Sequence, residues 1–340
     1  MTSQTNEQAL EAAIEKRLSG NSREELNLQF TPANMVEERE ALYRSGNGYY
    51  ISYPEDFNAR LAIDEIRLLD FLQSTQKEDL AKLQKQSDWK LKILERIDRT
   101  IKKFGIIRLF RKGLDVDDAH FTILYPLPLA SSSEMVKNNF ESNQFSVTRQ
   151  LRYSLANPGE EIDMVLFANG LPFATMELKN HWTGQTAKVH GQNQYKYKRD
   201  ITQPLLNFGR CIVHFAVDTD EAYMTTKLDG ANTFFLPFNL GNNFGKGNPP
   251  NLFGHKTAYL WEEIFKRTSI ANIIQHFVRF DGKDTDPLNK KTLYFPRYHQ
   301  LDVVRRLVTD CSKKGTGQTY LIQHSAGSGK SNSITWAAYQ

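Results

Sequence analysis

The chain has 340 residues, a mass of 39.1 kDa and a formal net charge of +4. This length suggests two domains, or one large domain with part of another. Apolar residues make up 40% and charged residues 24%, which excludes a globally disordered chain. The two cysteines, Cys211 and Cys311, form no C-x-x-C pair, which excludes a disulfide scaffold and a thiolate zinc site. We expect a cytoplasmic protein with no membrane partner, because neither a signal peptide nor a long apolar run is found.

The amino-terminal third predicts helices joined by polar loops. Apolar stripes at helical spacing predict one helix over 5–18 and another over 59–75. The mixed, polar stretch 21–58 predicts loops with short strands. Residues 82–112 carry 11 Lys or Arg against 3 Asp or Glu and predict an amphipathic helix with a basic outer face. Such a face is either a solvated surface or a contact for phosphates, and both readings stay open.

Short strands dominate the middle of the chain. Asn169-Gly170 is a strong turn signal between the second and third of them, and a helix over about 185–199 separates the third from the fourth. Strands on both sides of one helix predict a mixed α/β sheet flanked by helices. The five predicted strands cover 144–153, 162–168, 172–179, 210–218 and 222–228.

The carboxy-terminal part predicts an irregular loop and a second folding unit. Residues 230–257 are rich in Gly, Asn and Pro and predict a long loop, and 258–280 predicts helix. We expect a domain over 1–280 with amino-terminal helices, a linker over 281–295 and the start of another domain over 296–340. That last part predicts a helix over 298–311, a strand over 319–323, a Gly-rich turn and a final helix.

The Gly-rich turn, HSAGSGKS at 324–331, has the pattern of a phosphate-binding loop between a strand and a helix. Glycines let successive backbone N–H groups point at one anion, and the helix amino terminus adds positive potential. Lys330 would bridge the β- and γ-phosphates of ATP and Ser331 would reach Mg²⁺. His324 replaces the first glycine of the consensus, and the alternative is a Gly-Ser linker before a helix. The residues predicted to bind the nucleotide are Gly327, Ser328, Gly329, Lys330 and Ser331.

An aromatic and glutamine element, FPRYHQ at 295–300, precedes this loop. It resembles the adenine-reading element of superfamily 2 helicases, in which Gln300 would contact the adenine edge through its amide. The alternative, equally open, is a helix start with surface polar residues. The chain ends nine residues after Ser331, before a second acidic nucleotide motif could occur. We therefore expect a fragment of a larger motor protein that does not hydrolyse ATP by itself.

A second group of residues has the D…ExK pattern of metal-dependent nucleases. Asp163 begins one strand, and Glu177 and Lys179 end the next. Asp163 and Glu177 would bind Mg²⁺, and Lys179 would orient or stabilise the attacking hydroxide. The alternative is a solvated strand end, because many hairpins end in charged residues.

The spacing of these residues makes a structural demand. A strict two-residue hairpin at Asn169-Gly170 would pair Asp163 with Met176 and place Glu177 on the other face. A shared metal ion therefore requires a three-residue loop or a β-bulge.

These elements in this order resemble the R subunit of type I restriction enzymes. The resemblance extends from about residue 50 to residue 340 and rests on the stretches LAIDE, DMVLFANGLPFATMELKN, QYKYKRD, HFAVDTDEAYMTTKL, RYHQ and HSAGSGKS. It implies a RecB-like, PD-(D/E)xK nuclease domain followed by the start of a RecA-like P-loop domain. It also implies cleavage of double-stranded DNA coupled to ATP-driven translocation, in complex with methyltransferase (M) and specificity (S) subunits.

The family resemblance also assigns roles to residues. Asp163, Glu177 and Lys179 would be catalytic. A Gln-x-x-x-Tyr helix usually positions the DNA, and here Gln194 and Tyr197 are the candidates, although they are only three residues apart. An amino-terminal helix often adds an acidic residue, for which Glu11 is the candidate.

Two other functions fit the same residues. The chain could be a DNA-binding, motor-coupling module of a superfamily 2 helicase with an inactive nuclease hairpin. It could also be an unrelated P-loop protein whose amino-terminal domain only binds a partner. Convergence of the D…ExK side chains around one ion-sized space would distinguish the nuclease from these two alternatives.

Overall fold

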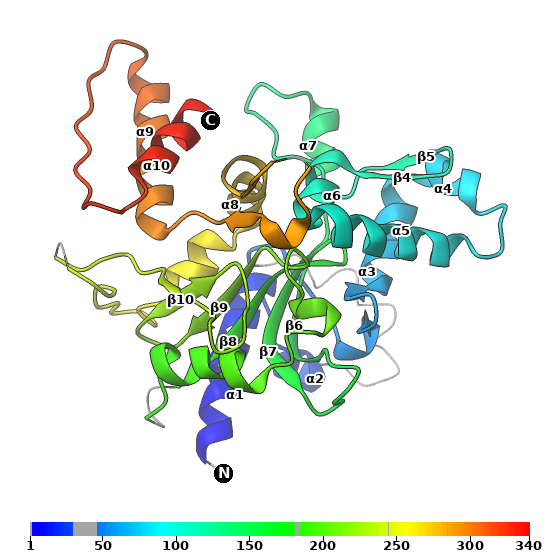
Figure 1. Cartoon of the computed structure of the whole chain (residues 1–340), viewed down its shortest axis with the longest axis horizontal. Coiled ribbons are helices and arrows are strands. Elements are labelled where there is room, and N and C mark those ends of the chain that lie inside the picture. The colour runs from blue at the N-terminus through cyan, green and yellow to red at the C-terminus, as the bar shows by residue number, and fades with distance from the viewer. Residues whose placement is uncertain (1, 30–45, 181–183, 244, 284) are drawn as a thin grey trace.

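The computed structural model describes residues 2–29, 46–180, 184–243, 245–283 and 285–340. A seven-stranded sheet forms its centre, in the order β1-β6-β7-β8-β9-β10-β11 (Figure 1). Its strands are β1 (Tyr50–Ile51), β6 (Phe145–Arg152), β7 (Glu161–Ala168), β8 (Leu171–Leu178), β9 (Val213–Val217), β10 (Ala222–Thr225) and β11 (Leu236–Pro237). Each of the five predicted strands is present.

The central strand β8 is buried along its whole length. It pairs antiparallel with β7 and parallel with β9, so the predicted mixed α/β sheet is confirmed. Two-sided burial explains why β8 is a nearly continuous apolar run, because neither of its faces meets water. Charges at its carboxyl end are therefore exceptions that need partners.

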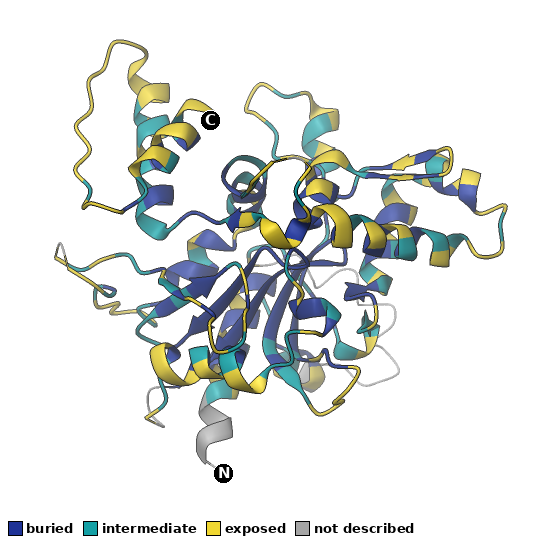
Figure 2. Ribbon diagram, in the orientation of Figure 1, coloured by how far each residue is buried: buried dark blue, intermediate teal, exposed yellow. Residues whose placement is uncertain are grey.

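Helices surround the sheet, and its strands form the buried interior in Figure 2. On one side, Leu10, Ile14 and Leu18 of α1 join the main apolar cluster with Met164 and Met176. A smaller cluster around Val165, Phe167 and Tyr195 is separate from it. The α-helices are α1 (Thr2–Ser19), α2 (Arg23–Gln29), α3 (Glu65–Thr75), α4 (Lys77–Leu83), α5 (Trp89–Phe104), α6 (Ile106–Lys112), α7 (Glu134–Glu141), α8 (Arg267–Asn272), α9 (Tyr298–Lys314) and α10 (Lys330–Ala338).

Three elements predicted in the first 200 residues differ in the structure. The stretch predicted as loop over 21–58 contains α2, and its residues 30–45 lie outside the described part. The basic helix predicted over 82–112 is interrupted by a turn at 84–88 and is divided again into α5 and α6 at Gly105, whose φ of 78° interrupts the helical backbone. The helix over 185–199 is replaced by two π-helical segments, Ala187–Gly191 and Gln194–Lys198.

Short hairpins and helical turns complete the chain. The predicted helix over 258–280 consists of Leu260–Ile264, α8 and Ile273–Phe277. Single 3₁₀ turns lie at Pro54–Asp56, Pro204–Leu206 and Leu288–Lys290. The hairpins pair β2 (Phe57–Asn58) with β3 (Ile63–Asp64), β4 (Leu114–Val116) with β5 (Ala119–Phe121), and β12 (Arg279–Asp281) with β13 (Thr292–Tyr294).

The carboxy-terminal segment packs on this body through a few apolar contacts. Leu301 and Val304 of α9 and Trp336 of α10 join the main cluster, and the Trp336 ring lies 5.5 Å from that of Phe277. The predicted strand over 319–323 is wrong, because no strand of the described residues pairs with it and Leu321 is 96% exposed. Within the described residues, no helix is both long and apolar enough to cross a bilayer.

Candidate functional site

A β-bulge in the β7–β8 hairpin sets the geometry of the D…ExK residues. Next to the turn, Ala168 pairs with Leu171 and Phe167 with Pro172, as a strict two-residue hairpin requires. The register then shifts by one residue, so Leu166 pairs with Ala174 and Met164 with Met176. Continued by one residue, this register places Asp163 opposite Glu177. The sequence requirement for an irregular hairpin is therefore confirmed, with the bulge beside a two-residue turn.

Asp163 is anchored to the end of the neighbouring strand. Its Oδ2 accepts a 2.7 Å hydrogen bond from the Leu178 backbone N–H, and its side chain is 13% exposed. The partner strand β6 is also irregular here, since Gln150 has a φ of 51° between two regular pairs. The Asp163 carboxylate is thus fixed at the boundary between the sheet and solvent.

Lys179 lies in the same small space, almost fully buried. Its Nζ donates to the Leu178 carbonyl at 2.7 Å and lies 3.8 Å from Asp163 Oδ2. On its other side, Glu7 of α1 contributes a carboxylate oxygen 3.6 Å from Nζ. A buried ammonium needs such partners, and they hold Lys179 against Asp163.

Glu177 is fully buried and forms a bidentate ion pair with Arg199. Its Oε1 accepts from Arg199 Nε at 2.6 Å and its Oε2 from Nη2 at 3.0 Å. Burial and then the Asp163 carboxylate raise the pKa of Glu177 to about 8, whereas Arg199 opposes that rise. Burial alone would lower the pKa of Arg199, but Glu177 raises it.

These two shifts point in opposite directions for the charge on Glu177. A raised pKa of Arg199 requires an ionised Glu177, whereas the raised pKa of Glu177 favours its neutral form. We favour the ion pair, because each carboxylate oxygen accepts from a different guanidinium nitrogen. The pKa of Glu177 is high even with Arg199 in place, because burial and the Asp163 carboxylate together outweigh the guanidinium.

The acidic face of α1 surrounds Arg149 of β6 beside this site. Arg149 donates to Glu11 at 3.0 Å, to Glu15 at 3.1 Å and to Glu24 of α2 at 2.8 Å. Burial and then the Asp163 carboxylate raise the pKa of Glu11 to about 7. The Asp163 carboxylate therefore disfavours the charged form of Glu11. The α1 residue that contacts Lys179 is Glu7.

The two residues predicted to position DNA differ in how far they are exposed to solvent. Tyr197 is 66% exposed, whereas Gln194 is half-buried and its Oε1 has no hydrogen-bond partner among the described side chains. The buried tyrosine is Tyr195, whose hydroxyl lies 2.7 Å from Thr175 Oγ1 on β8. Thr175 Oγ1 also lies 2.8 Å from Nδ1 of the buried His214.

Sequence reasoning missed Arg199, Glu7 and Tyr195. The π-helical backbone changes which residues of 187–198 face the sheet, so a search at α-helical spacing did not distinguish Tyr195 from Tyr197. Arg199 was part of a run of cations with no signal that it faces Glu177. A buried acid at the end of an apolar strand was the available signal, because such an acid needs a cation.

The donor atoms at this hairpin end are of the kind that hard divalent cations prefer. Asp163, Glu177 and the Leu178 carbonyl offer oxygen only. Across the described ranges, no three His, Cys, Asp or Glu side chains are grouped closely enough to hold a metal ion. The chain's own cations occupy the donors, with Lys179 on the carbonyl and Arg199 on Glu177. The donors fit an ion that retains several waters, provided that Arg199 releases Glu177.

The candidate phosphate loop is open and largely exposed. Gly327 has a φ of 71°, and Gly329, at 81°, precedes the first residue of α10. Lys330 Nζ donates to the His324 and Ser325 carbonyls of its own loop, at 3.2 and 3.3 Å, and Ser331 is exposed.

Gln300 is buried beneath this loop. Its Oε1 accepts from the Arg297 N–H at 2.9 Å, and its Nε2 donates to the Ser328 and Gly329 carbonyls, each at 3.1 Å. The amide thus ties the start of α9 to the loop, so it is engaged with protein backbone in this conformation.

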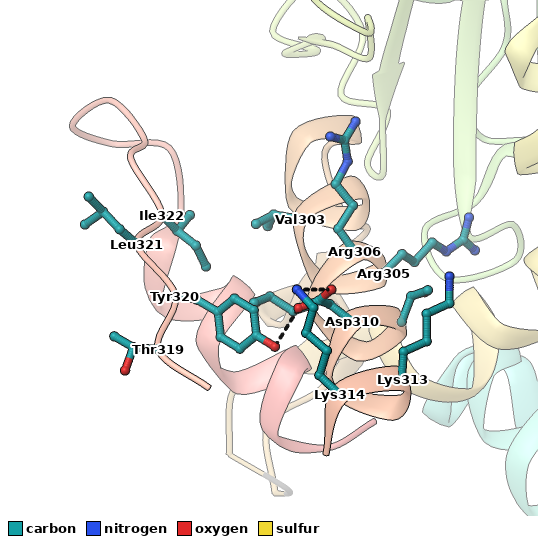
Figure 3. Close-up of a pocket in the computed structure, with 12 residues that line it drawn as sticks. Val303, Arg305, Arg306, Asp310, Lys313, Lys314, Thr319, Tyr320, Leu321 and Ile322 are labelled. Carbon is teal, nitrogen blue, oxygen red and sulfur yellow. Dashed lines mark hydrogen bonds and ion pairs between the residues drawn. The ribbon is translucent and has the colours of Figure 1, made fainter. Parts of the chain in front are cut away.

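A cavity of about 720 Å³ separates α9 from the extended stretch before the loop (Figure 3). Tyr320 bridges part of it, since its hydroxyl donates to Asp310 Oδ2 at 2.9 Å, and Lys314 pairs with the same carboxylate. Leu321 stays exposed, because no sheet of the described residues covers this stretch.

Comparison with known proteins identifies the region that contains this hairpin. The family model described as type I restriction enzyme R protein N terminus matches residues 47–233, more than half of the chain. A curated relative, the type I restriction enzyme HindI endonuclease subunit of Haemophilus influenzae, is 22% identical over 247 residues. That alignment covers 71% of this chain and 22% of the relative, so the chain corresponds to about a fifth of its length.

Proposed function

The chain belongs to the family of type I restriction enzyme R protein N termini, and from that premise we propose that it is the Mg²⁺-dependent DNA endonuclease portion of such an enzyme. In the intact protein this portion would cut double-stranded DNA as ATP-driven translocation proceeds. The M and S subunits would be its partners and would supply DNA recognition. The RecB-like character of the sheet is part of this proposal.

The observation that carries the proposal is the bulged register of β7 and β8. Without the one-residue shift, Asp163 would oppose Met176 and the two carboxylates would lie on different faces. With it, Asp163 bonds to the N–H directly after Glu177, and Lys179 lies 3.8 Å from Asp163. A strand end that served only solubility would not require buried charges in this arrangement.

The roles follow from these positions. Asp163, Glu177 and the Leu178 carbonyl would hold Mg²⁺, which when bound neutralises the phosphate and lowers the pKa of water. Lys179, already beside Asp163, would hold the attacking hydroxide or a phosphate oxygen. Arg199 would leave Glu177 as the ion binds and remain available for the DNA phosphate. Gln194 and Tyr197 would position the DNA, with Tyr195 supporting their segment against Thr175.

The carboxy-terminal segment would belong to a RecA-like motor domain. Its loop residues would bind ATP there, with Lys330 at the β- and γ-phosphates and Ser331 at Mg²⁺. Gln300 would exchange its contacts with the loop carbonyls for the adenine edge. The boundaries 1–280, 281–295 and 296–340 remain our proposed domain division.

A second function is favoured by one observation. Arg199 holds both oxygens of Glu177, and a permanent ion pair would leave no carboxylate for a metal ion. The chain would then be a DNA-binding, motor-coupling module with an inactive hairpin. The two functions differ in whether a divalent cation displaces Arg199.

The deciding experiment measures nicking of supercoiled plasmid by the 340-residue chain and cutting by the intact R subunit with its partners. Both are assayed with Mg²⁺ and with chelator, for the wild type and for Asp163→Ala. We expect chelator and Asp163→Ala each to lower cutting by ~10²-fold or more in the intact complex, while ATP hydrolysis continues.

The matched control is Glu161→Ala on the same strand. Glu161 lies two residues before Asp163 and pairs with the exposed Arg152 instead of the site. Its substitution should leave cutting within a factor of about 2. Metal-dependent cutting that survives Asp163→Ala would reject the assignment of cutting to this site, and thermal stabilisation by Mn²⁺ that depends on Asp163 would argue against the inactive module.

A further inference from the structure

The basic faces of α5 and α6 line a groove of about 260 Å³. On α5, Arg96, Arg99 and Lys103 follow helical spacing on one side, while Ile97 and Ile101 are buried on the other. The bend at Gly105 brings α6 against them. The cations that line the groove are Arg96, Arg99, Lys103, Arg108 and Lys112, and all of them are exposed.

Few acidic groups offset this charge. Arg99 pairs with Glu95 at 2.8 Å, and the Asp115 carboxylate, which also lines the groove, lies 2.7 Å from His120. Lys103, Arg108 and Lys112 have no ion-pair partner within the described part of the chain. The groove therefore gathers, in one small part of the surface, a positive charge comparable to the +4 of the whole chain.

Cation–π contacts keep two of these cations at the junction of the helices. Lys103 Nζ lies 4.9 Å from the centre of the Phe104 ring, and the Arg108 guanidinium lies 4.8 Å from it. Phe104 is 41% exposed, so the ring is held at the surface between them. These contacts place both cations beside one exposed ring at the junction of the two helices.

The groove lies at the opposite end of the sheet from the hairpin site. The Ile106 N–H of α6 donates to the Gly209 carbonyl, and Arg210 pairs with Asp98 of α5, directly before β9 begins. Because β9 runs parallel to β8, this is the amino-terminal end of β8, whereas Glu177 and Lys179 lie at its carboxyl end. The length of β8 separates them by roughly 20 Å. In Figure 1, α5 and α6 lie at the upper right and the N-terminus at the bottom.

We propose that the α5–α6 groove binds the phosphate backbone of duplex DNA at a position separate from the cleavage site. The inference rests on the proposed function for its choice of DNA as partner. Duplex DNA fits because it presents closely spaced negative charges along an edge, which a row of long, exposed cations can follow. The cations would position the duplex without reading its sequence.

The test measures binding of a labelled duplex of mixed sequence to the full 340-residue chain by fluorescence anisotropy, with chelator present so that no cutting occurs. The variant is Lys103→Glu with Arg108→Glu. We expect at least ~10-fold weaker binding, and a fall of about 2 in the slope of log affinity against log salt between about 50 and 200 mM.

The matched control is Lys85→Glu with Lys90→Glu. These two exposed lysines belong to the same basic stretch, do not line the groove and change the net charge equally. They should weaken binding by less than ~3-fold. Equal losses for the two pairs would indicate diffuse attraction and overturn the proposal, as would a loss in neither.

Two further measurements separate this proposal from other failures. If the reversal variant melts at a lower temperature, Lys103→Gln with Arg108→Gln keeps the side-chain bulk and should still lose more affinity than Lys85→Gln with Lys90→Gln. Metal-dependent cutting by the wild type in the intact complex is measured beside binding. Groove-dependent binding by a wild type that shows no metal-dependent cutting would reject the nuclease assignment and retain the groove.

Discussion

The open end of the β7–β8 hairpin, opposite its turn, and the loop at 324–331 each carry a motif that includes a lysine. The surroundings of the two motifs differ completely. Lys179 is buried and lies between Glu7 and Asp163, while Lys330 is exposed and contacts only carbonyls of its own loop. Glu177 is enclosed by sheet, Arg199 and the π-helical segment. No strand in the described part of the chain pairs with the stretch before Lys330.

This difference shows what a motif requires in order to become a site. Buried charges must be paired, so neighbouring residues in the hairpin region are held by the same contacts that would serve catalysis. An exposed loop has no such requirement and adopts contacts within itself. Substitutions in each region can test whether the β7–β8 site supports DNA cutting and whether the loop at 324–331 contributes to the stability of this chain.

Lys179→Ala should break the comparison most strongly. We expect cutting by the intact protein to fall by ~10²-fold or more, since no other lysine lies beside Asp163 in the described residues. ATP hydrolysis should be unchanged. Plasmid linearisation and phosphate release measure the two activities, and Lys188→Ala, an exposed lysine on the following segment, is the control. Full cutting activity without Lys179 would remove the assigned role.

Lys330→Ala should abolish activity in the intact protein but leave the stability of this chain unchanged. In the intact protein we expect loss of ATP hydrolysis and of translocation-dependent cutting, by ~10²-fold. In the 340-residue chain the melting temperature should stay within about 1 °C, because Lys330 contacts only two loop carbonyls. Cutting by the intact protein that persists without Lys330 would separate this chain from ATP-driven enzymes.

Arg199→Met tests how the hairpin site is held before a metal ion binds. Without the guanidinium, Glu177 must be buried as a neutral acid, so we expect a loss of about 1–3 kcal/mol in the free energy of unfolding. Mn²⁺ should restore more stability to the variant than to the wild type, because it no longer competes with Arg199. Chemical denaturation with and without metal measures both, and Arg152→Met, at an exposed ion pair, is the control. Equal responses to metal in variant and wild type would contradict the competition.

Glu11→Gln should have the smallest effect, on the pH dependence of stability. Burial and Asp163 raise the pKa of Glu11 to about 7, above its value of 4.5 in the unfolded chain. The folded state therefore favours the protonated form, and this stabilisation, full below about pH 4.5, is lost as pH rises towards 7.

Glu11→Gln removes this titration, so its stability should decline less over that range, by about 1–3 kcal/mol. Urea unfolding at both ends of the range isolates the difference from any constant effect of losing the Arg149 pair. Glu134→Gln on α7, whose side chain is 81% exposed, should follow the wild-type profile. Parallel profiles for Glu11→Gln and wild type would show that Glu11 titrates normally.

The strands were predictable because each is a short apolar run bounded by turn residues, and Asn169-Gly170 specifies its turn through two positive φ angles. Residues 319–323 meet the same criteria, but the strand predicted there is wrong. An apolar run becomes a strand only when another strand pairs with it. The division at Gly105 and the π-helical segments also escaped prediction. The division at Gly105 depends on close packing, because a Cβ there would lie 2.5 Å from the Phe280 ring.

By itself, the sequence indicated the residues that would perform the proposed chemistry and required an irregular hairpin to bring Asp163 and Glu177 together. Only the tertiary structure decided the position of the bulge, the cation that faces Glu177 and which tyrosine is buried. The reason is physical: motif and turn preferences act over a few residues of chain. Burial of a charge is decided by residues far apart in sequence, such as Glu7 and Lys179, that the sheet and α1 bring within ion-pair distance.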